Sequence, residues 1–164
     1  MKAAQFSRYG GPEVLEIVDL PDPHPGPGQV RIVVHAAGIS ATDVKLRAGT
    51  LTFGAELPQT TGRDVAGVVD EVGAGVTDVA VGDRALAPGG VDAALDGAKE
   101  HGVHFSNGFV DGHAFHSLAE VGELIATGRF WLPVERTFPL AEIARARHVS
   151  EHGHVRGRLV LVIR

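Results

Sequence analysis

A glycine pair in the middle of the chain lies between two β-rich runs, and this arrangement limits what the chain can fold into. Residues 65–72 read VAGVVDEV, Gly73 and Gly75 follow, and residues 76–87 read VTDVAVGDRALA. The spacing comes close to the G-x-G-x-x-G loop of dinucleotide sites, but that loop opens a helix whose N-terminus faces the pyrophosphate. Here β-branched residues follow and Asp78 replaces the third glycine. We therefore predict a β-hairpin, with no nucleotide site at this position.

Short strands are predicted throughout the first 88 residues. Glycine and proline separate the candidates, and the four prolines between 21 and 28 exclude a helix there. The later residues favour helices, including one that ends at Gly128 and one with Leu140, Ile143 and Ala144 on one face. The predicted strands are 2–6, 13–20, 29–40, 63–73, 82–88, 103–110 and 157–163, and the predicted helices are 41–49, 116–130 and 140–152. Residues 91–102 are interpreted as a strand leading into a helix or as a short helix.

Composition excludes several classes of function. The net charge of −5 argues against nucleic acid or an acidic membrane as a partner. The absence of cysteine excludes disulfides, cysteine-ligated zinc, iron–sulfur clusters and thiol nucleophiles. No apolar run is long enough to span a bilayer and the N-terminus shows no signal-peptide core. We expect a cytoplasmic protein with one domain, or one domain and an appendage.

Four phrases carry a family resemblance. They are YGGPEVLEIVDLPDPHPGPGQVRIVVHAAGISATDVKLRAG, GRDVAGVV, AGVVDEVGAGVTDVAVGDR and, near the end, GELIATGRFWLPVERTFPLAEIARARHVSEHGHVRGRLVLVI. In this order they resemble the zinc-independent quinone oxidoreductase branch of the medium-chain dehydrogenase/reductase superfamily. The resemblance covers nearly all of residues 1–88 and resumes at Gly122.

The resemblance implies a mainly β fold with added α-structure: a GroES-like, partly open β-barrel with C-terminal helices packed on it. Residues 1–88 are the N-terminal part of this catalytic barrel, and 113–164 are the helices and strand that return to it. Residues 89–112 form a junction, where GGVDAALDGA is similar to a late strand of the family's nucleotide-binding domain. No complete Rossmann domain fits there, so that domain is interpreted as largely deleted, in nature or by design.

The resemblance also bears on metals. Zinc-containing members use a cysteine and a histidine as ligands, and the matching positions here hold Ser40 and Arg63. Neither is a zinc ligand, so no zinc is expected. The junction region contains two H-x-x-H pairs, formed by His101, His104, His113 and His116. Their spacing is compatible with a metal site, but they match no metal site of the family.

The loop and helical turn after AAG line the family's cleft. They supply Ser40, Thr42 and Lys45 as candidate catalytic residues, with a hydrogen-bond donor activating a carbonyl in place of zinc. The Ser40 hydroxyl has an alternative role in bonding its own backbone. Lys45 and Arg47 face either cofactor phosphate or solvent. Arg47 and Arg158 are the candidate cofactor-binding residues, with Arg158 alternatively an exposed charge on an edge strand.

Four residues are expected to shape the cleft: Tyr9, Asp43, Arg63 and Asp64. Asp43 is interpreted as a helix cap rather than a catalyst. Asp64 is expected to pair with Arg63, Arg47 or nearby backbone N–H groups. Tyr9 belongs to the family phrase and serves in packing or as a cleft wall.

By resemblance, the chain is the catalytic domain of an oxidoreductase that passes a hydride from NADPH to a quinone or enone. With the cofactor domain missing, we expect no tight NADPH binding and very weak or no activity. The alternative is a non-catalytic GroES-like binding or self-assembly module. A homodimer through the Val103–Val110 strand is expected to cover the edge that the deletion leaves.

Overall fold

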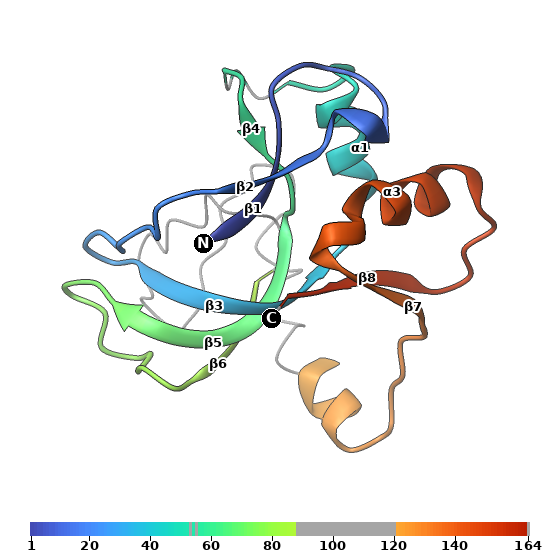
Figure 1. Ribbon diagram of the computed structural model, residues 1–164. Coiled ribbons are helices and arrows are strands. Elements are labelled where there is room, and N and C mark those ends of the chain that lie inside the picture. Colours follow the sequence, from blue (N-terminus) through green and yellow to red (C-terminus); the bar gives the residue numbers. More distant parts are fainter. Residues whose placement is uncertain (53, 55, 88–120, 164) are drawn as a thin grey trace.

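The computed structural model describes residues 1–52, 54, 56–87 and 121–163. Two β-sheets form the framework, with helices at one end (Figure 1). The three-stranded sheet has the order β2-β1-β4, and the five-stranded sheet has the order β6-β5-β3-β8-β7. The sheets remain separate ladders within the described residues, as expected for a partly open barrel of GroES-like type.

The small sheet is built on the N-terminus. Its strands are β1 (Lys2–Phe6), β2 (Glu16–Asp19) and β4 (Gln59–Thr60), all antiparallel. The predicted strand 13–20 is shorter than expected, because a 3-10 turn, η1 (Pro12–Val14), precedes β2. Proline fits the first turn of a helix, where its missing N–H has no intrahelical partner.

The large sheet joins distant parts of the chain. Its strands are β3 (Val30–Gly38), β5 (Asp64–Val72), β6 (Arg84–Ala87), β7 (Val134–Pro139) and β8 (Arg158–Val162). β3 pairs antiparallel with both β5 and β8, and β8 pairs in parallel with β7. The last strand therefore completes the sheet begun by the first 88 residues, as predicted.

The predicted β-hairpin is present. β5 and β6 pair antiparallel through the Gly73–Gly82 connection. Gly75 takes a positive φ of 83°, and a Cβ on Gly73 would lie 1.9 Å from the Gly26 carbonyl oxygen. Gly73 is therefore required by close approach to the turn before β3, and Gly75 by the turn itself. Neither glycine opens a helix.

Helices cover one end of the large sheet. α1 (Ala41–Arg47) follows β3, and α3 (Ile143–His152) follows a 3-10 turn, η2 (Leu140–Glu142), after β7. Residues 121–126 are also helical, and Gly128 follows them with a φ of 70°. No helix in the described residues is long and apolar enough to cross a membrane.

The core lies between α3 and the sheet. It contains Ala4 from β1, Ala37 and Ile39 from the end of β3, Phe138 from β7, Ile143 and Ala146 from α3, and Leu159 and Leu161 from β8. Ala146, rather than the predicted Ala144, is the fully buried alanine of α3. The packing fixes α3 against the end of β3, where the candidate cleft residues begin.

The predicted elements at 91–102 and 103–110, the Val103–Val110 interface and the H-x-x-H histidines all lie outside the described residues.

Candidate functional site

The candidate site begins where β3 ends and α1 starts. Ser40 is the N-cap of α1, with extended backbone angles, and its Oγ accepts a hydrogen bond of 3.1 Å from the Thr42 backbone N–H. This bond is the local backbone interaction that the sequence suggested as an alternative to a catalytic role for Ser40. A hydroxyl that accepts one bond still has its own proton to donate. Ser40 is half-buried, so that proton can reach a ligand.

Asp43 does not cap the helix, so that part of the prediction was wrong. Ser40 holds the cap position, three residues earlier, and Asp43 lies in the first turn with only 2% of its surface exposed. Its Oδ2 accepts from Arg147 Nη2 at 2.7 Å, and its Oδ1 accepts from the Gly62 backbone N–H at 3.3 Å. Asp43 is thus half of a buried ion pair.

Arg147 of α3 connects three segments of the site. Besides Asp43, it donates to the Ser40 carbonyl oxygen at 3.0 Å and to Thr61 Oγ1 at 3.2 Å. Its side chain is 1% exposed. A buried guanidinium is stable only when its donors are well used. Arg147 therefore fixes the backbone of Ser40 relative to the loop before β5.

Arg47 is buried, so the reading of the sequence in which it faces solvent was wrong, while its cofactor-binding role stays a prediction. Its side chain is 3% exposed, and Nη2 donates to the Glu151 carboxylate at 2.9 and 3.1 Å. Its Nε donates to the Gly10 carbonyl oxygen at 3.0 Å. Its Nη1 is buried and has no hydrogen-bond partner among the described residues, so an anion from outside would have to enter the interior to reach that donor.

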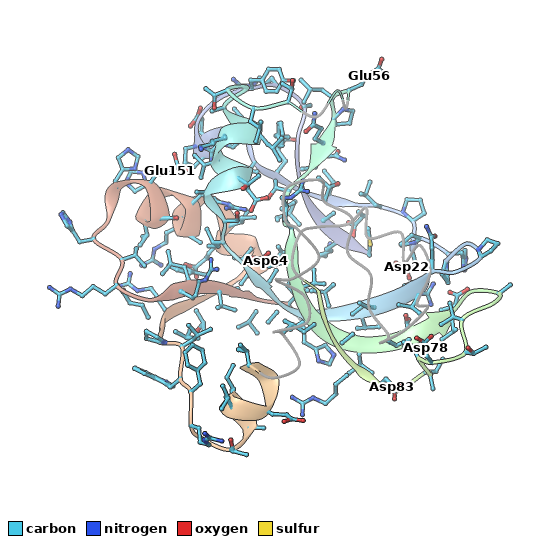
Figure 2. All side chains as sticks on the ribbon, turned by 180° about the vertical axis from the view of Figure 1, so that it is seen from behind. Asp22, Glu56, Asp64, Asp78, Asp83 and Glu151 are labelled. Atoms are coloured by element: carbon cyan, nitrogen blue, oxygen red, sulfur yellow. The ribbon has the colours of Figure 1, made fainter. Side chains whose placement is uncertain are left out.

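The two buried ion pairs have matched spacing. Asp43 and Arg47 lie one turn apart on α1, and their partners Arg147 and Glu151 lie one turn apart on α3. The order of the pairs means that the helices run in the same direction, side by side. Figure 2 labels Glu151 between α3 and α1, and Asp64 near the centre where β5 begins.

The remaining predicted residues do not gather around Ser40. Lys45 and Arg158 are exposed, and Arg158 begins β8. Tyr9 is 43% exposed, and Gly49, which has no side chain, lies against its ring. Arg63 and Asp64 are half-buried and both take part in interactions. The pairing of Asp64 with Arg63, Arg47 or nearby backbone N–H groups stays a prediction.

The zinc-ligand positions do not suit a metal. Ser40 uses its hydroxyl to cap α1, and Arg63 carries a positive charge. Within the part of the chain that the structure describes, no group of three or more histidine, cysteine, aspartate or glutamate residues could hold a metal ion. We therefore assign no catalytic role to zinc at this site.

A cavity lies elsewhere in the molecule. A cavity of about 1630 Å³ separates the two sheets and is lined by Ala4, Val34, Val65 and Leu161, among others. Ser40, Thr42 and Lys45 are absent from its lining. We favour the surroundings of Ser40 as the candidate catalytic site, because no polar side chain of α1 lines this cavity.

Sequence reasoning missed Arg147 and Glu151. The signal was present, since Arg147 falls one turn after Ile143 and next to Ala146 on the apolar face of α3. A charged residue within an apolar stripe indicates a buried partner. The identity of that partner, 104 residues away, could not be read from the spacing.

Comparison with known proteins decides the family. Residues 26–124 match the family model described as the alcohol dehydrogenase GroES-like domain, which is more than half of the chain. The chain belongs to this family. The GroES-like domain is 42% identical over 85 residues to a quinone oxidoreductase of Rattus norvegicus, covering 51% of this chain and 26% of that protein. It is 41% identical over 111 residues to a quinone oxidoreductase of Pseudomonas aeruginosa, covering 65% and 34%.

These similarities place the GroES-like domain in the quinone oxidoreductase branch of the medium-chain dehydrogenase/reductase superfamily. Among solved structures, the Escherichia coli quinone oxidoreductase complexed with NADPH matches with a TM-score of 0.54 and 23% identity, covering 85% of this chain and 44% of that one. This match shows the fold alone. The chain spans about a quarter of the length of the Rattus relative.

Proposed function

We propose that this chain is the catalytic domain of an NADPH-dependent, zinc-independent quinone or enone oxidoreductase, and that it lacks the nucleotide site needed to work alone. The observation that carries the proposal is the 42% identity to a quinone oxidoreductase over 85 residues that make up only 26% of that relative. The similarity thus reaches the cleft-forming part, while most of the relative's length has no counterpart in that alignment.

The Ser40 hydroxyl supports the chemistry. A carbonyl oxygen gains negative charge as hydride arrives, and a preorganised donor lowers the energy of that charge. Ser40 keeps its proton free while its oxygen caps α1, and Arg147 holds its carbonyl group at 3.0 Å. We propose Ser40 as the donor to the substrate oxygen, with Thr42 and Lys45 at the mouth of the cleft.

NADPH would supply the hydride in the intact enzyme, and little in the described residues fits its phosphates. Arg47 is committed to Glu151, and the Gly73–Gly82 connection is a hairpin. Lys45 and Arg158 are exposed cations, but single exposed cations bind phosphate weakly because water screens them. We therefore propose very weak or no activity for the isolated chain.

A domain-insertion experiment tests this function. The nucleotide-binding domain of the Escherichia coli quinone oxidoreductase is inserted at residues 89–112, and NADPH oxidation is followed with and without a quinone. We expect quinone-dependent oxidation by the fusion and none by the chain alone. A fusion that binds NADPH but transfers no hydride to any quinone or enone would contradict the proposal.

Two substitutions in the fusion separate capping from catalysis at Ser40. Ser40→Asn keeps both an N-cap and a hydrogen-bond donor, whereas Ser40→Asp keeps the cap but has no proton to donate at neutral pH. We expect Ser40→Asp to lower kcat about 100-fold and Ser40→Asn to retain most of it. Ser7→Ala, at an exposed turn, is the control. Equal kcat values in the Asn and Asp variants would remove Ser40 from the mechanism.

Exposed apolar side chains favour the second candidate, a binding or self-assembly module. Phe130, Trp131, Leu132 and Val134 follow one another and are 40%, 77%, 53% and 55% exposed. Contiguous exposed apolar surface is typical of association sites. Light scattering at micromolar concentration distinguishes the two roles, because an assembly module is oligomeric and remains so after Ser40→Asp.

A further inference from the structure

We propose that His148 and His152 form a binding site for a divalent transition-metal ion on the exposed side of α3. The two residues are one helical turn apart, and both are exposed. Their rings are stacked, with centroids 4.4 Å apart and planes inclined by 24°. Side chains four residues apart project from the same face of a helix, so both imidazoles can reach one ion. The site is separate from Ser40 and from the zinc positions of the family.

A hydrogen bond prepares His152 for coordination. Its Nδ1 lies 3.2 Å from the His148 backbone carbonyl oxygen. A carbonyl can only accept, so Nδ1 donates, and the lone pair of the neutral ring is on Nε2. Histidine ligands in metal sites commonly donate their second ring nitrogen to a backbone carbonyl in this way, which fixes the tautomer and the ring orientation.

The surrounding charges select the class of metal. Two carboxylates on or next to α3 already have partners: Glu151 pairs with Arg47, and Glu142, which precedes α3, pairs with Arg145 at 2.8 Å. The donor set is therefore two imidazoles completed by water, since the described residues offer no third protein ligand. Imidazole suits Cu²⁺, Ni²⁺ and Zn²⁺, and the general affinity order puts Cu²⁺ first, whereas Mg²⁺ and Ca²⁺ require oxygen ligands.

Metal bound at this pair would strengthen the end of α3. His148 directly follows Arg147 and His152 directly follows Glu151, so an ion that joins the two histidines holds the turn that contains Glu151 and adjoins Arg147. A ligand that binds the folded state and not the unfolded one raises stability by mass action. The unfolding temperature should therefore rise with Cu²⁺ concentration.

The experiment uses two readouts with CuCl₂ as the probe. In the wild-type chain, Cu²⁺ below one equivalent is added and the histidine ring resonances are followed by NMR, since the paramagnetic ion broadens those nearest to it. His148 and His152 are expected to broaden before His24, His35 and His154. Earlier broadening of any of those three histidines would overturn the proposal.

Affinity is then measured from the shift in unfolding temperature. The background carries His101, His104, His113 and His116 replaced by glutamine, so that the junction histidines do not compete. We expect His148→Gln and His152→Gln each to weaken Cu²⁺ binding at least about tenfold. His154→Gln is the matched control, an exposed histidine just beyond the helix, and should leave the affinity unchanged. An unchanged affinity in either His148→Gln or His152→Gln would contradict a shared site.

Discussion

At the scale of single residues, the molecule depends on charges buried between α1 and α3. Asp43 and Arg147 are 2% and 1% exposed, and each is the other's charged partner. Burying an ion is costly unless its partner is present, so removing one member is far more harmful than removing both. Neither member of the pair is on the surface that a ligand would touch.

Substitution of Arg147 tests this dependence. Arg147→Met should lower the free energy of unfolding by about 3–5 kcal/mol, because Asp43 is left buried without its charged partner. Urea denaturation measures the loss. Arg145→Met is the control, since its pair with Glu142 is exposed and should change stability by less than about 1 kcal/mol. Recovery in the double variant Asp43→Leu/Arg147→Met is expected, and a double variant less stable than Arg147→Met would contradict the account.

A second residue-scale prediction concerns acid stability. Arg31 Nε and Nη2 donate to the Asp70 carboxylate at 2.9 Å, and this hydrogen bonding lowers the pKa of Asp70 below its ordinary value. A carboxyl whose pKa is lower in the folded state stabilises the fold above its unfolded pKa. That contribution is lost as the pH falls through the folded pKa.

The free energy of unfolding measured between pH 6 and pH 2 should therefore fall less steeply in Asp70→Asn than in the wild type. Asp78→Asn, at an exposed position of the β5–β6 connection, is the control and should keep the wild-type slope. Identical slopes in the wild type and Asp70→Asn would show that the ion pair contributes nothing to acid sensitivity.

At the scale of elements, the strands with strong sequence patterns were predictable. β1, β3, β5, β6 and β8 fall within their predicted ranges, because β-branched runs bounded by glycine and proline favour strands locally. β4 was not predictable: two residues have no periodicity, and β4 exists only by pairing with β1. The first residues of the predicted strand 13–20 belong to η1 instead, because Pro12 favours a helical turn.

The candidate site was less predictable than the fold. The local backbone bond offered as one role of Ser40 is present, but the N-cap was expected at Asp43 and is Ser40, because several short polar residues near a helix start can all serve as caps. The burial of Arg47 was not predicted, because a lone arginine at the end of a helix gives no indication of burial. That burial depends on Glu151, which lies 104 residues away.

The β5–β6 hairpin supplies the element-scale prediction. Gly73→Ala should lower the free energy of unfolding by about 1–3 kcal/mol, because its Cβ would overlap the Gly26 carbonyl group. Gly122→Ala is the control: this helical glycine has open space around it, and alanine there should stabilise by up to about 1 kcal/mol. Thermal unfolding compares the two. Equal effects of the two substitutions would mean that the close approach at Gly73 does not constrain the hairpin.

At the scale of the whole molecule, the chain carries a GroES-like domain that is similar to quinone oxidoreductases, and we propose that it lacks a nucleotide site. Both halves of the chain contribute to one sheet, because β8 pairs with β3. The glycine pair that resembles a dinucleotide loop forms a hairpin turn instead, and Arg47 is buried in an ion pair with Glu151.

Fluorescence titration of the isolated chain with NADPH tests this claim most directly. The Escherichia coli quinone oxidoreductase, which has been solved with NADPH, serves as the positive control. We expect no saturable binding by this chain at micromolar NADPH, because the described residues offer the phosphates only isolated exposed cations. Saturable binding with a micromolar Kd would contradict the account, since it would require a nucleotide site within these 164 residues.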